Sequence, residues 1–278
     1  MKVFSFILIS VVLKCSENED FKMLKIIYPP DYFNTKKVDD MFDKEATAFK
    51  NAGFDVHVWN LSYIPSGEYI YRGWMLSEKE YAELDSFMKG HNAKLITSPD
   101  DYLNAHYLKN WYDKLSDLTP KTIFATEDSI KEILNQSDWN KFFVKDYVKS
   151  LTTTNGSIAN SKEEVLDIIQ ELSKKRGITG GISLREVQDF VTDSEIRYFC
   201  INGKVISPAG DVPDIVNIVR NRIDLPFYSI DVIQDTNGKE WIVEIGDGQV
   251  SDLKLPWSPI NFVNSIKNTQ KKVIKNKP

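Results

Sequence analysis

The sequence contains few of the side chains that usually build disulfides or histidine-based metal sites. Cys15 and Cys200 are the two cysteines among 278 residues, and the three histidines are scattered along the chain. Two cysteines cannot form a disulfide framework or a cysteine-rich zinc site. A Ser/His/Asp or Cys/His pattern, which would indicate a nucleophilic catalyst, is also absent. The chemistry must therefore be sought among carboxylates, lysines and arginines.

An excess of positive charge is absent as well. The formal net charge is -5, which gives no electrostatic reason to expect nucleic acid as a partner. Hydrophobic residues make up 42% of the chain and charged residues 27%, so a sizeable core can form and global disorder is not expected. The length suits one large domain or two modest ones.

Long hydrophobic runs are missing, so no stable membrane span is expected. The apolar run at residues 3–13 is too short to cross a bilayer, but it has the length of the apolar part of a signal peptide. Cys15 hints at a lipoprotein cleavage site, although Lys14 stands where a small residue is expected. Alternatively, Met23 is the natural start and residues 1–22 are an upstream extension. We expect a cytoplasmic protein, with an exported or lipid-anchored one as the alternative.

The pattern over residues 23–125 predicts a small open α/β domain. Short apolar runs alternate with amphipathic segments, and glycines or capping serines punctuate them. Strands are expected at 24–28, 54–59 and 93–97, and helices at 38–49 and after Ser77 and Ser98. A strand, a helix and a second strand within roughly 35 residues are typical of a βαβ unit.

Residues 126–266 predict an α+β domain with antiparallel sheets. A strand is expected at 142–150, and two Asn-Gly pairs, at 202–203 and 237–238, indicate β-hairpins. Strands are then separate from helices rather than alternating with them. The lysine-rich tail at 267–278 is expected to be frayed.

The second hairpin suggests a chemical site. If Asn237-Gly238 forms a two-residue loop, Thr236 faces Lys239 and pairing proceeds outward one residue at a time. Asp231 then lies directly opposite Glu244, on one face of the sheet. Like charges in this arrangement are destabilising unless a cation compensates them.

Magnesium is one cation that this pair could bind. It usually takes one or two carboxylates together with substrate phosphates. Asp231 and Glu244 supply that number, and Asp247 and Gln249 follow in a glycine-flanked segment. The alternative is that Asp231 or Glu244 is exposed or paired with a lysine.

Two lysines and a loop suggest phosphate binding. Lys145 and Lys149 are four residues apart on the strand expected at 142–150, so they would share a face. Two ammonium groups suit a polyphosphate, and the backbone amides of the small residues at 151–156 could cover it. The alternative is an exposed edge strand protected by lysine.

A further group of charged residues lies at 185–197. Glu186 and Glu195 could bond a ribose hydroxyl or an adenine amino group, with Arg185 beside them. Arg197 could stabilise charge on a transferring phosphoryl group. Taken alone, these four residues are typical of ordinary surface ion pairs.

Together, these segments resemble the ATP-grasp superfamily, and most closely its clade named for one arginine and two lysines. The resemblance is carried by segments 143–149, 195–199, 227–232 and 241–250. It covers about residues 125–265, with a looser match at 71–76. It implies an α/β N-terminal domain followed by an α+β ATP-grasp domain with antiparallel sheets, and ATP and Mg2+ as cofactors.

The resemblance also implies roles for residues. Lys145 and Lys149 match the lysines that contact ATP phosphates, Glu186 lies near the adenine hinge, and Glu195 matches the ribose-binding glutamate. Arg185 beside Glu186 is a further candidate for contacting the nucleotide.

The metal ligands implied by the resemblance are Asp231 and Glu244. The family's Glu-x-Asn ending is replaced here by Glu244-Ile245-Gly246, so Asp247 or Gln249 would have to replace the asparagine. The glycine-rich loop retains only Gly156.

The implied reaction activates a carboxylate as an acyl phosphate, which an amine or another nucleophile attacks. Candidate catalytic residues are Arg197, Lys149 and Arg72, the last as a bidentate carboxylate clamp. The expected partners are a small-molecule or peptide carboxylate and a nucleophile. The alternatives are an ATP-dependent phosphotransferase and a non-catalytic nucleotide-binding protein. The sequence leaves the oligomeric state open.

Overall fold

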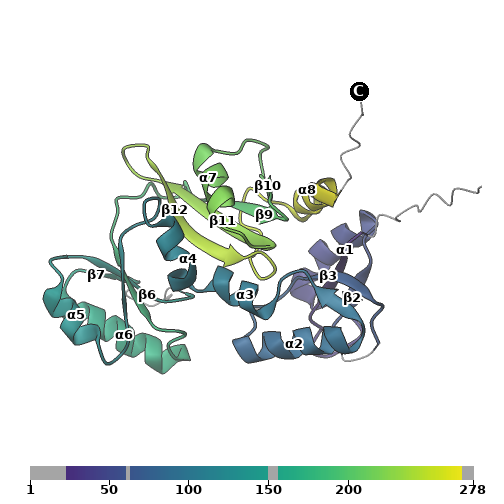
Figure 1. Cartoon of the computed structure of the whole chain (residues 1–278), viewed down its shortest axis with the longest axis horizontal. Helices are drawn as coiled ribbons and strands as arrows, with labels where there is room; N and C mark the ends of the chain where they lie inside the picture. The colour runs from purple at the N-terminus through teal and green to yellow at the C-terminus, as the bar shows by residue number, and fades with distance from the viewer. Residues whose placement is uncertain (1–22, 61–62, 150–155, 271–278) are drawn as a thin grey trace, which may run out of the picture.

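The computed structural model describes residues 23–60, 63–149 and 156–270. The leader at 1–22, most of the small-residue loop at 151–156 and the end of the basic tail lie outside these ranges. The described residues contain three four-stranded sheets and eight α-helices (Figure 1). No helix among them is both long and apolar enough to cross a membrane.

The N-terminal part is a parallel sheet with helices packed against it, as expected for an α/β domain. Its strand order is β2-β1-β3-β4. The strands are β1 Lys25–Tyr28, β2 Val56–Val58, β3 Gly67–Tyr71 and β4 Ala93–Leu95, and the helices are α1 Asp43–Asn51, preceded by the 3-10 turn Asp40–Phe42, and α2 Glu78–Gly90.

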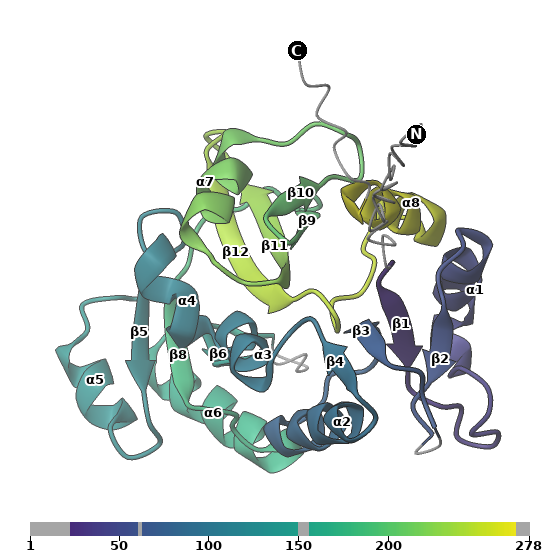
Figure 2. The same ribbon diagram turned by 45° about the vertical axis from the view of Figure 1, so that its right-hand side comes forward.

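The helix starts in this part follow from local hydrogen bonds. Ser77 and Glu80 form a capping box at the start of α2, and Ser98 and Asp101 form a second one at α3 (Pro99–His106). Both predicted starts are confirmed. Helix α3 and the following α4 (Leu108–Leu115) lie between the three sheets (Figure 2).

The second sheet is antiparallel, with order β5-β8-β6-β7. Its strands are β5 Thr122–Ala125, β6 Phe142–Asp146, β7 Ile158–Ala159 and β8 Ile182–Glu186, and its helices are α5 Ile130–Gln136 and α6 Lys162–Arg176. Strand β5, which the sequence pattern assigns to the N-terminal domain, pairs with β8 here.

The strand predicted at 142–150 is shorter than expected, and this corrects the placing of Lys149. Strand β6 ends at Asp146, whose Oδ1 accepts from the backbone N–H groups of Val148 and Lys149 at 2.8 and 2.7 Å. A side chain that bonds the following amides favours a turn over a continued strand. Lys149 is therefore an exposed turn residue and does not share a strand face with Lys145.

The third sheet is also antiparallel, with order β10-β9-β11-β12. Its strands are β9 Ile196–Ile201, β10 Lys204–Ile206, β11 Phe227–Gln234 and β12 Glu240–Asp247, and its helices are α7 Asp214–Arg222 and α8 Pro259–Gln270. The Asn202-Gly203 turn is confirmed, because Lys204 pairs with Ile201. Helix α8 continues through Gln270, into the segment predicted to be a frayed tail.

The β11–β12 hairpin reaches the predicted pairing by a different route. Asp235 bonds Lys239, so the loop has three residues and the predicted facing of Thr236 and Lys239 is wrong. A bulge between Asp231 and Val232 then shifts the register by one residue. The two errors cancel, and Asp231 lies opposite Glu244 as predicted.

The bulge also changes which side chains face the core. Val243 is the extra residue of the bulge and is only half-buried, whereas Ile242 is fully buried. Val243 therefore does not pack fully into the core. Its backbone carbonyl is instead available to a side chain of the neighbouring sheet.

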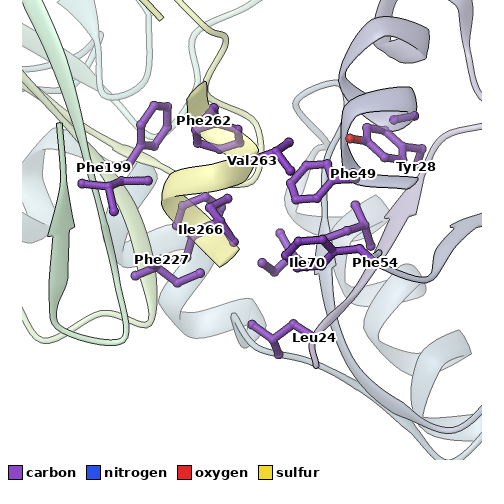
Figure 3. Packing of buried hydrophobic residues seen from close by; sticks show 14 of the residues in the cluster. Leu24, Tyr28, Phe49, Phe54, Ile70, Phe199, Phe227, Phe262, Val263 and Ile266 are labelled. Atoms are coloured by element: carbon purple, nitrogen blue, oxygen red, sulfur yellow. The ribbon is translucent and has the colours of Figure 1, made fainter. Parts of the chain in front are cut away.

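One hydrophobic cluster joins the N-terminal part to the third sheet. Figure 3 shows Phe49 and Ile70 of the N-terminal part facing Phe262 and Ile266 of α8, with Phe199 of β9 behind them. All five residues are buried. This shared core fixes the parallel sheet against the strands that carry the predicted site.

Candidate functional site

The centre of the candidate site is an ion pair between two sheets. Lys145 Nζ, from β6, lies 2.9 Å from Glu244 Oε1, on β12. The Lys145 side chain is 6% exposed and that of Glu244 is 36% exposed. A buried ammonium thus meets a carboxylate that solvent or a ligand can still reach.

Asp231, opposite Glu244, is held by a different cation. Arg197, its partner on the neighbouring strand β9, donates from Nε and Nη2 to the two carboxylate oxygens at 2.7 and 2.6 Å. Burial alone would raise the pKa of Asp231, but the Arg197 guanidinium outweighs it and the pKa is lowered. Protein cations therefore compensate both facing carboxylates in this structure.

Lys254, which no sequence motif marks, joins this group. Its Nζ lies 2.5 Å from Glu195 Oε1 and 3.4 Å from Asp231 Oδ2. Arg197 Nη1 also bonds Asp252. Lys254 and Asp252 come from the segment after β12, and no strand or helix periodicity marks them.

Glu195 and Lys254 also border an open pocket of about 800 Å3. The other lining residues are mostly apolar and include Phe190, Val191 and Ile233. A pocket with apolar walls and a few charged groups is typical of a small-molecule site.

Arg185 projects from β8 on the same face as Lys145. Its Nη1 donates to the carbonyl of the bulged Val243 at 2.7 Å, and its Nη2 donates to Thr119 Oγ1 at 2.5 Å. Burial lowers the pKa of Arg185 to about 10, partly offset by Glu244. The structure therefore brings Arg185 together with Lys145 and Glu244.

Glu186 and Lys149 lie at the edges of this arrangement. Glu186 ends β8, where its backbone N–H bonds Lys121 and its carboxylate accepts from Gln188. Lys149 is exposed, and its backbone carbonyl accepts from Arg176 at 2.8 Å. Their predicted nucleotide contacts stay predictions.

His106, at the end of α3, is a second residue that the sequence does not indicate. Its ring nitrogens are buried and its ring stacks on Tyr102 at 4.8 Å. Burial lowers the pKa of His106 to about 4, with Glu244 and Lys145 as nearby charges. A single histidine on a helix carries no pattern that would have identified it.

Asp247 and Gln249 do not join Asp231 and Glu244. Side chains alternate along a strand, so Asp247 shares a face with the core residue Ile245 and not with Glu244. Burial raises the pKa of Asp247 to about 7. Gln249 bonds the backbone of Tyr71 and the hydroxyl of Tyr81.

Arg72 lies at the carboxyl end of β3 and is 3% exposed. It donates to both carboxylate oxygens of Glu45 at 2.8 Å, and through Nη1 to the carbonyls of Gly248 and Ser251. These contacts hold the segment that follows β12 against the N-terminal part. Its proposed role as a substrate clamp stays a prediction.

The donor set can be tested for its fit to magnesium. Among residues 23–60, 63–149 and 156–270, no group of three or more Asp, Glu, His or Cys side chains is placed to hold a metal ion. Two facing carboxylates, Asp231 and Glu244, nevertheless match the one or two that magnesium takes beside phosphates. Arg197 donates to both oxygens of Asp231, so a magnesium ion held by this pair stays a prediction.

The comparisons with known proteins agree with this geometry. Residues 109–266, more than half of the chain, match the ATP-grasp domain, R2K clade family 3. The chain belongs to the ATP-grasp family. The matched segment contains β5 to β12, and thus Lys145, Arg197, Asp231 and Glu244. No curated protein matches the chain significantly.

Solved structures of other ATP-grasp proteins share the fold over nearly the whole described chain. The D-cycloserine synthetase DcsG has a TM-score of 0.59 and 14% identity, covering 88% of this chain and 99% of its own. The ligase PsnB, complexed with a precursor variant, Mg and ADP, has a TM-score of 0.55 and 11% identity, covering 90% of this chain and 98% of its own. The macrocyclase MdnC from Microcystis aeruginosa MRC, bound with precursor peptide MdnA, has a TM-score of 0.54 and 11% identity, covering 89% of this chain and 100% of its own. At these identities the likeness shows the fold alone.

Proposed function

We propose that this ATP-grasp protein is a magnesium-dependent ligase that activates a carboxylate as an acyl phosphate for attack by an amine or a similar nucleophile. The observation that carries the proposal is the meeting of Lys145 and Glu244, opposite Asp231, between two sheets. One sheet supplies a cation for phosphate oxygens, and the other supplies carboxylates for a metal.

Lys145 has the first role in binding. In the structure it pairs with Glu244. Lys145 would bind the phosphate oxygens of a nucleotide in place of that carboxylate, which would leave Glu244 for a metal ion. Magnesium, held by Glu244 and Asp231, would supply the charge that neutralises the phosphates. Lys149, an exposed residue after β6, would also contact the phosphate chain.

Arg197 and Glu195 complete the roles on the third sheet. Arg197 is fixed by Asp231, so its guanidinium is preorganised to stabilise charge on the phosphoryl group or the carboxylate substrate. Glu195 borders the open pocket and would accept hydrogen bonds from the ribose hydroxyls. Its ion pair with Lys254 would then be broken.

The substrate is proposed to be a small-molecule or peptide carboxylate. Similar folds include a D-cycloserine synthetase, a ligase complexed with a precursor peptide and a macrocyclase bound with a precursor peptide. For such a substrate, the protein would hold the carboxylate in line with a phosphoryl group. Because the reaction consumes ATP, we also propose that the protein acts in the cytoplasm.

Calorimetry of Mg·ADP binding tests the site. Glu244→Gln keeps the size of the side chain but removes the charge, and it should weaken binding by at least about tenfold. Glu240→Gln, which removes the same charge from the same strand nearer the hairpin loop, should bind as the wild type does. No binding by the wild type would refute the proposal.

Analysis of the reaction products then distinguishes a ligase from an ATP-dependent phosphotransferase. With a carboxylate and an amine, a ligase releases ADP and inorganic phosphate and forms an amide. A photometric assay of phosphate release, together with mass spectrometry of the product, distinguishes the two. A stable phosphorylated product, formed without a second nucleophile, would support the phosphotransferase instead.

A further inference from the structure

Large apolar side chains are exposed together on two loops of the N-terminal part. Tyr32 and Phe33, on the loop after β1, are 88% and 92% exposed. Met41, further along the same connection, and Trp74 and Met75, on the loop after β3, are exposed as well. These five residues are called the apolar patch below. A cluster of exposed apolar side chains usually marks an interaction surface.

The two loops lie side by side. Strands β1 and β3 are parallel neighbours in which Ile27 pairs with Tyr71, so the loops that follow them leave the same edge of the sheet. Trp74 Nε1 donates to Asp39 Oδ2 at 3.1 Å, and the Trp74 ring lies 5.1 Å from the ring of Phe42. These contacts join the loop after β3 to the connection that carries the other apolar side chains.

The loop after β1 has a hydrogen-bonded backbone. Asp31 Oδ1 accepts from the N–H groups of Phe33 and Asn34 at 3.0 and 2.7 Å. The Asp31 N–H donates to the Lys37 carbonyl at 2.9 Å, and the Lys37 N–H donates to the Asn34 carbonyl at 2.8 Å. The rings of Tyr32 and Phe33 meet edge to face at 5.1 Å. A partner that binds these rings therefore has little backbone to order, which favours association.

The apolar patch is large enough for a protein interface. A fully exposed aromatic side chain offers about 150–250 Å2 for burial, so Tyr32, Phe33 and the 48% exposed Trp74 together offer roughly 340–570 Å2. A standard interface buries about 800 Å2 on each partner. The three aromatic residues thus supply about half of that area, and the methionines and flanking residues add to it.

The charges beside the apolar patch indicate which partner fits. Exposed side chains of both signs flank it along the chain: Lys36, Lys37, Lys44, Asp40 and Asp43. A surface of mixed sign has little attraction for an anionic membrane. It does match a second copy of itself, because in a two-fold interface the lysines of one protomer can face the aspartates of the other.

We propose that the apolar patch is the interface of a two-fold symmetric homodimer. Its aromatic side chains form the buried centre, and the flanking lysines and aspartates form the rim. The interface adjoins the segment after β12, since Gly73, next to Trp74, donates its N–H to the Gln249 carbonyl at 3.3 Å. The dimer does not depend on the proposed ligase activity.

Sedimentation velocity of the full chain, over roughly a hundredfold range of concentration, tests the dimer. The wild type should sediment with twice the chain mass of 32.0 kDa. Phe33→Glu should weaken association by at least about tenfold, because it places a charge in the centre of the interface. Tyr63→Glu is the matched control and should associate as the wild type does. Tyr63 is also an exposed aromatic residue, but it precedes β3, and its ring lies 6.3 Å from that of His91.

An exchange of charges tests whether the partner is a second copy. Lys36→Glu/Lys37→Glu makes the rim acidic, and Asp40→Lys/Asp43→Lys makes it basic. Each double variant alone should associate more weakly than the wild type, because like charges then face each other. An equal mixture of the two should form a heterodimer with about the affinity of the wild-type dimer. A peptide or membrane partner would not produce this recovery.

The outcomes decide the proposal. A wild type that is monomeric over the whole range overturns it, and so does a monomer that instead co-sediments with vesicles of phosphatidylcholine and phosphatidylserine. A dimer that Phe33→Glu and Tyr63→Glu leave equally intact uses another surface and also overturns it. Thermal unfolding checks that each variant is folded. If Phe33→Glu is unfolded, the mixture of the charge variants decides.

Discussion

Two buried arginine–carboxylate pairs of the same geometry lie in two regions of this protein. Arg72 forms an ion pair with Glu45 at the junction of the N-terminal part with the segment after β12. Arg197 forms an ion pair with Asp231 in the candidate site. Each arginine uses Nε and Nη2 on the two oxygens, at 2.8 Å in the first pair and at 2.7 and 2.6 Å in the second.

The surroundings of the two pairs differ. The remaining nitrogen of Arg72 bonds backbone carbonyls, and the Phe262 ring lies 4.9 Å from its guanidinium. The remaining nitrogen of Arg197 bonds Asp252, which is 79% exposed, and Lys254 also reaches Asp231. Neutral groups close the first pair, whereas exposed or partly exposed charged side chains extend the second. The same pair geometry is therefore closed by neutral groups in one region and remains next to accessible charges in the other.

Breaking the closed pair should have the largest effect. Arg72→Met leaves Glu45 as a buried charge, so the free energy of unfolding should fall by about 3–5 kcal/mol. Urea unfolding measures this change. The double variant Arg72→Met/Glu45→Gln should recover part of the loss, because no charge is then left unpaired. A loss of stability below about 1 kcal/mol in the single variant would contradict a structural role of the Arg72–Glu45 pair.

Breaking the open pair should cost less stability. In Arg197→Met, Lys254 still neutralises Asp231, so we expect a loss of about 2–3 kcal/mol by the same urea measurement. The affinity for Mg·ADP should also fall in Arg197→Met. The same affinity should change less in Arg72→Met. If the two variants lose equal stability, the contrast between the two regions is wrong.

The pH dependence sharpens the comparison at the site. His106 has a pKa of about 4 in the folded chain, against about 6.5 when unfolded. The unfolded state therefore binds more protons between these values, and stability falls as the pH drops from about 6.5 towards 4. At pH 5 this loss amounts to at most about 2 kcal/mol.

The measurement compares His106→Phe with the wild type by urea unfolding at pH 7.5 and pH 5. The variant should lose less stability than the wild type between the two values. The difference is needed because the raised pKa of Asp247 acts in the opposite sense, favouring the folded state as the pH falls below about 7. Equal losses in both proteins would rule out a titrating His106.

A surface pair sets the lower end of the scale. Arg222 and Asp117 form a two-pronged ion pair, but their side chains are 38% and 59% exposed. Arg222→Ala should change the free energy of unfolding less than either buried arginine variant does, because water screens the pair. A loss as large as that of Arg197→Met would show that geometry alone, without burial, sets these energies.

The local features of the fold could be predicted from the sequence. Ser77 with Glu80, and Ser98 with Pro99, place helix starts because their hydrogen bonds involve residues three apart. The Asn202-Gly203 turn is equally local, with both residues at positive φ.

Predictions were less reliable where they extended the two-residue period of a strand past the residue at which local hydrogen bonds end or shift that strand. The two-residue period placed Lys149 on the strand with Lys145, but the Asp146 carboxylate ends the strand by bonding the next amides. In the β11–β12 hairpin, a longer loop and a bulge cancelled, so the facing of Asp231 and Glu244 was right for an incomplete reason.

By itself, the sequence determined the class of fold, the helix caps and the carboxylates, lysines and arginine from which a site could be built. The tertiary structure alone decided which of them meet. Lys145 and Glu244 are 99 residues apart, and the partners of Arg72, Glu45 and Gly248, lie 27 and 176 residues away from it. Hydrogen-bond patterns within a strand or helix fix local geometry, but only the packing of three sheets on a shared core determines which distant charges neutralise one another.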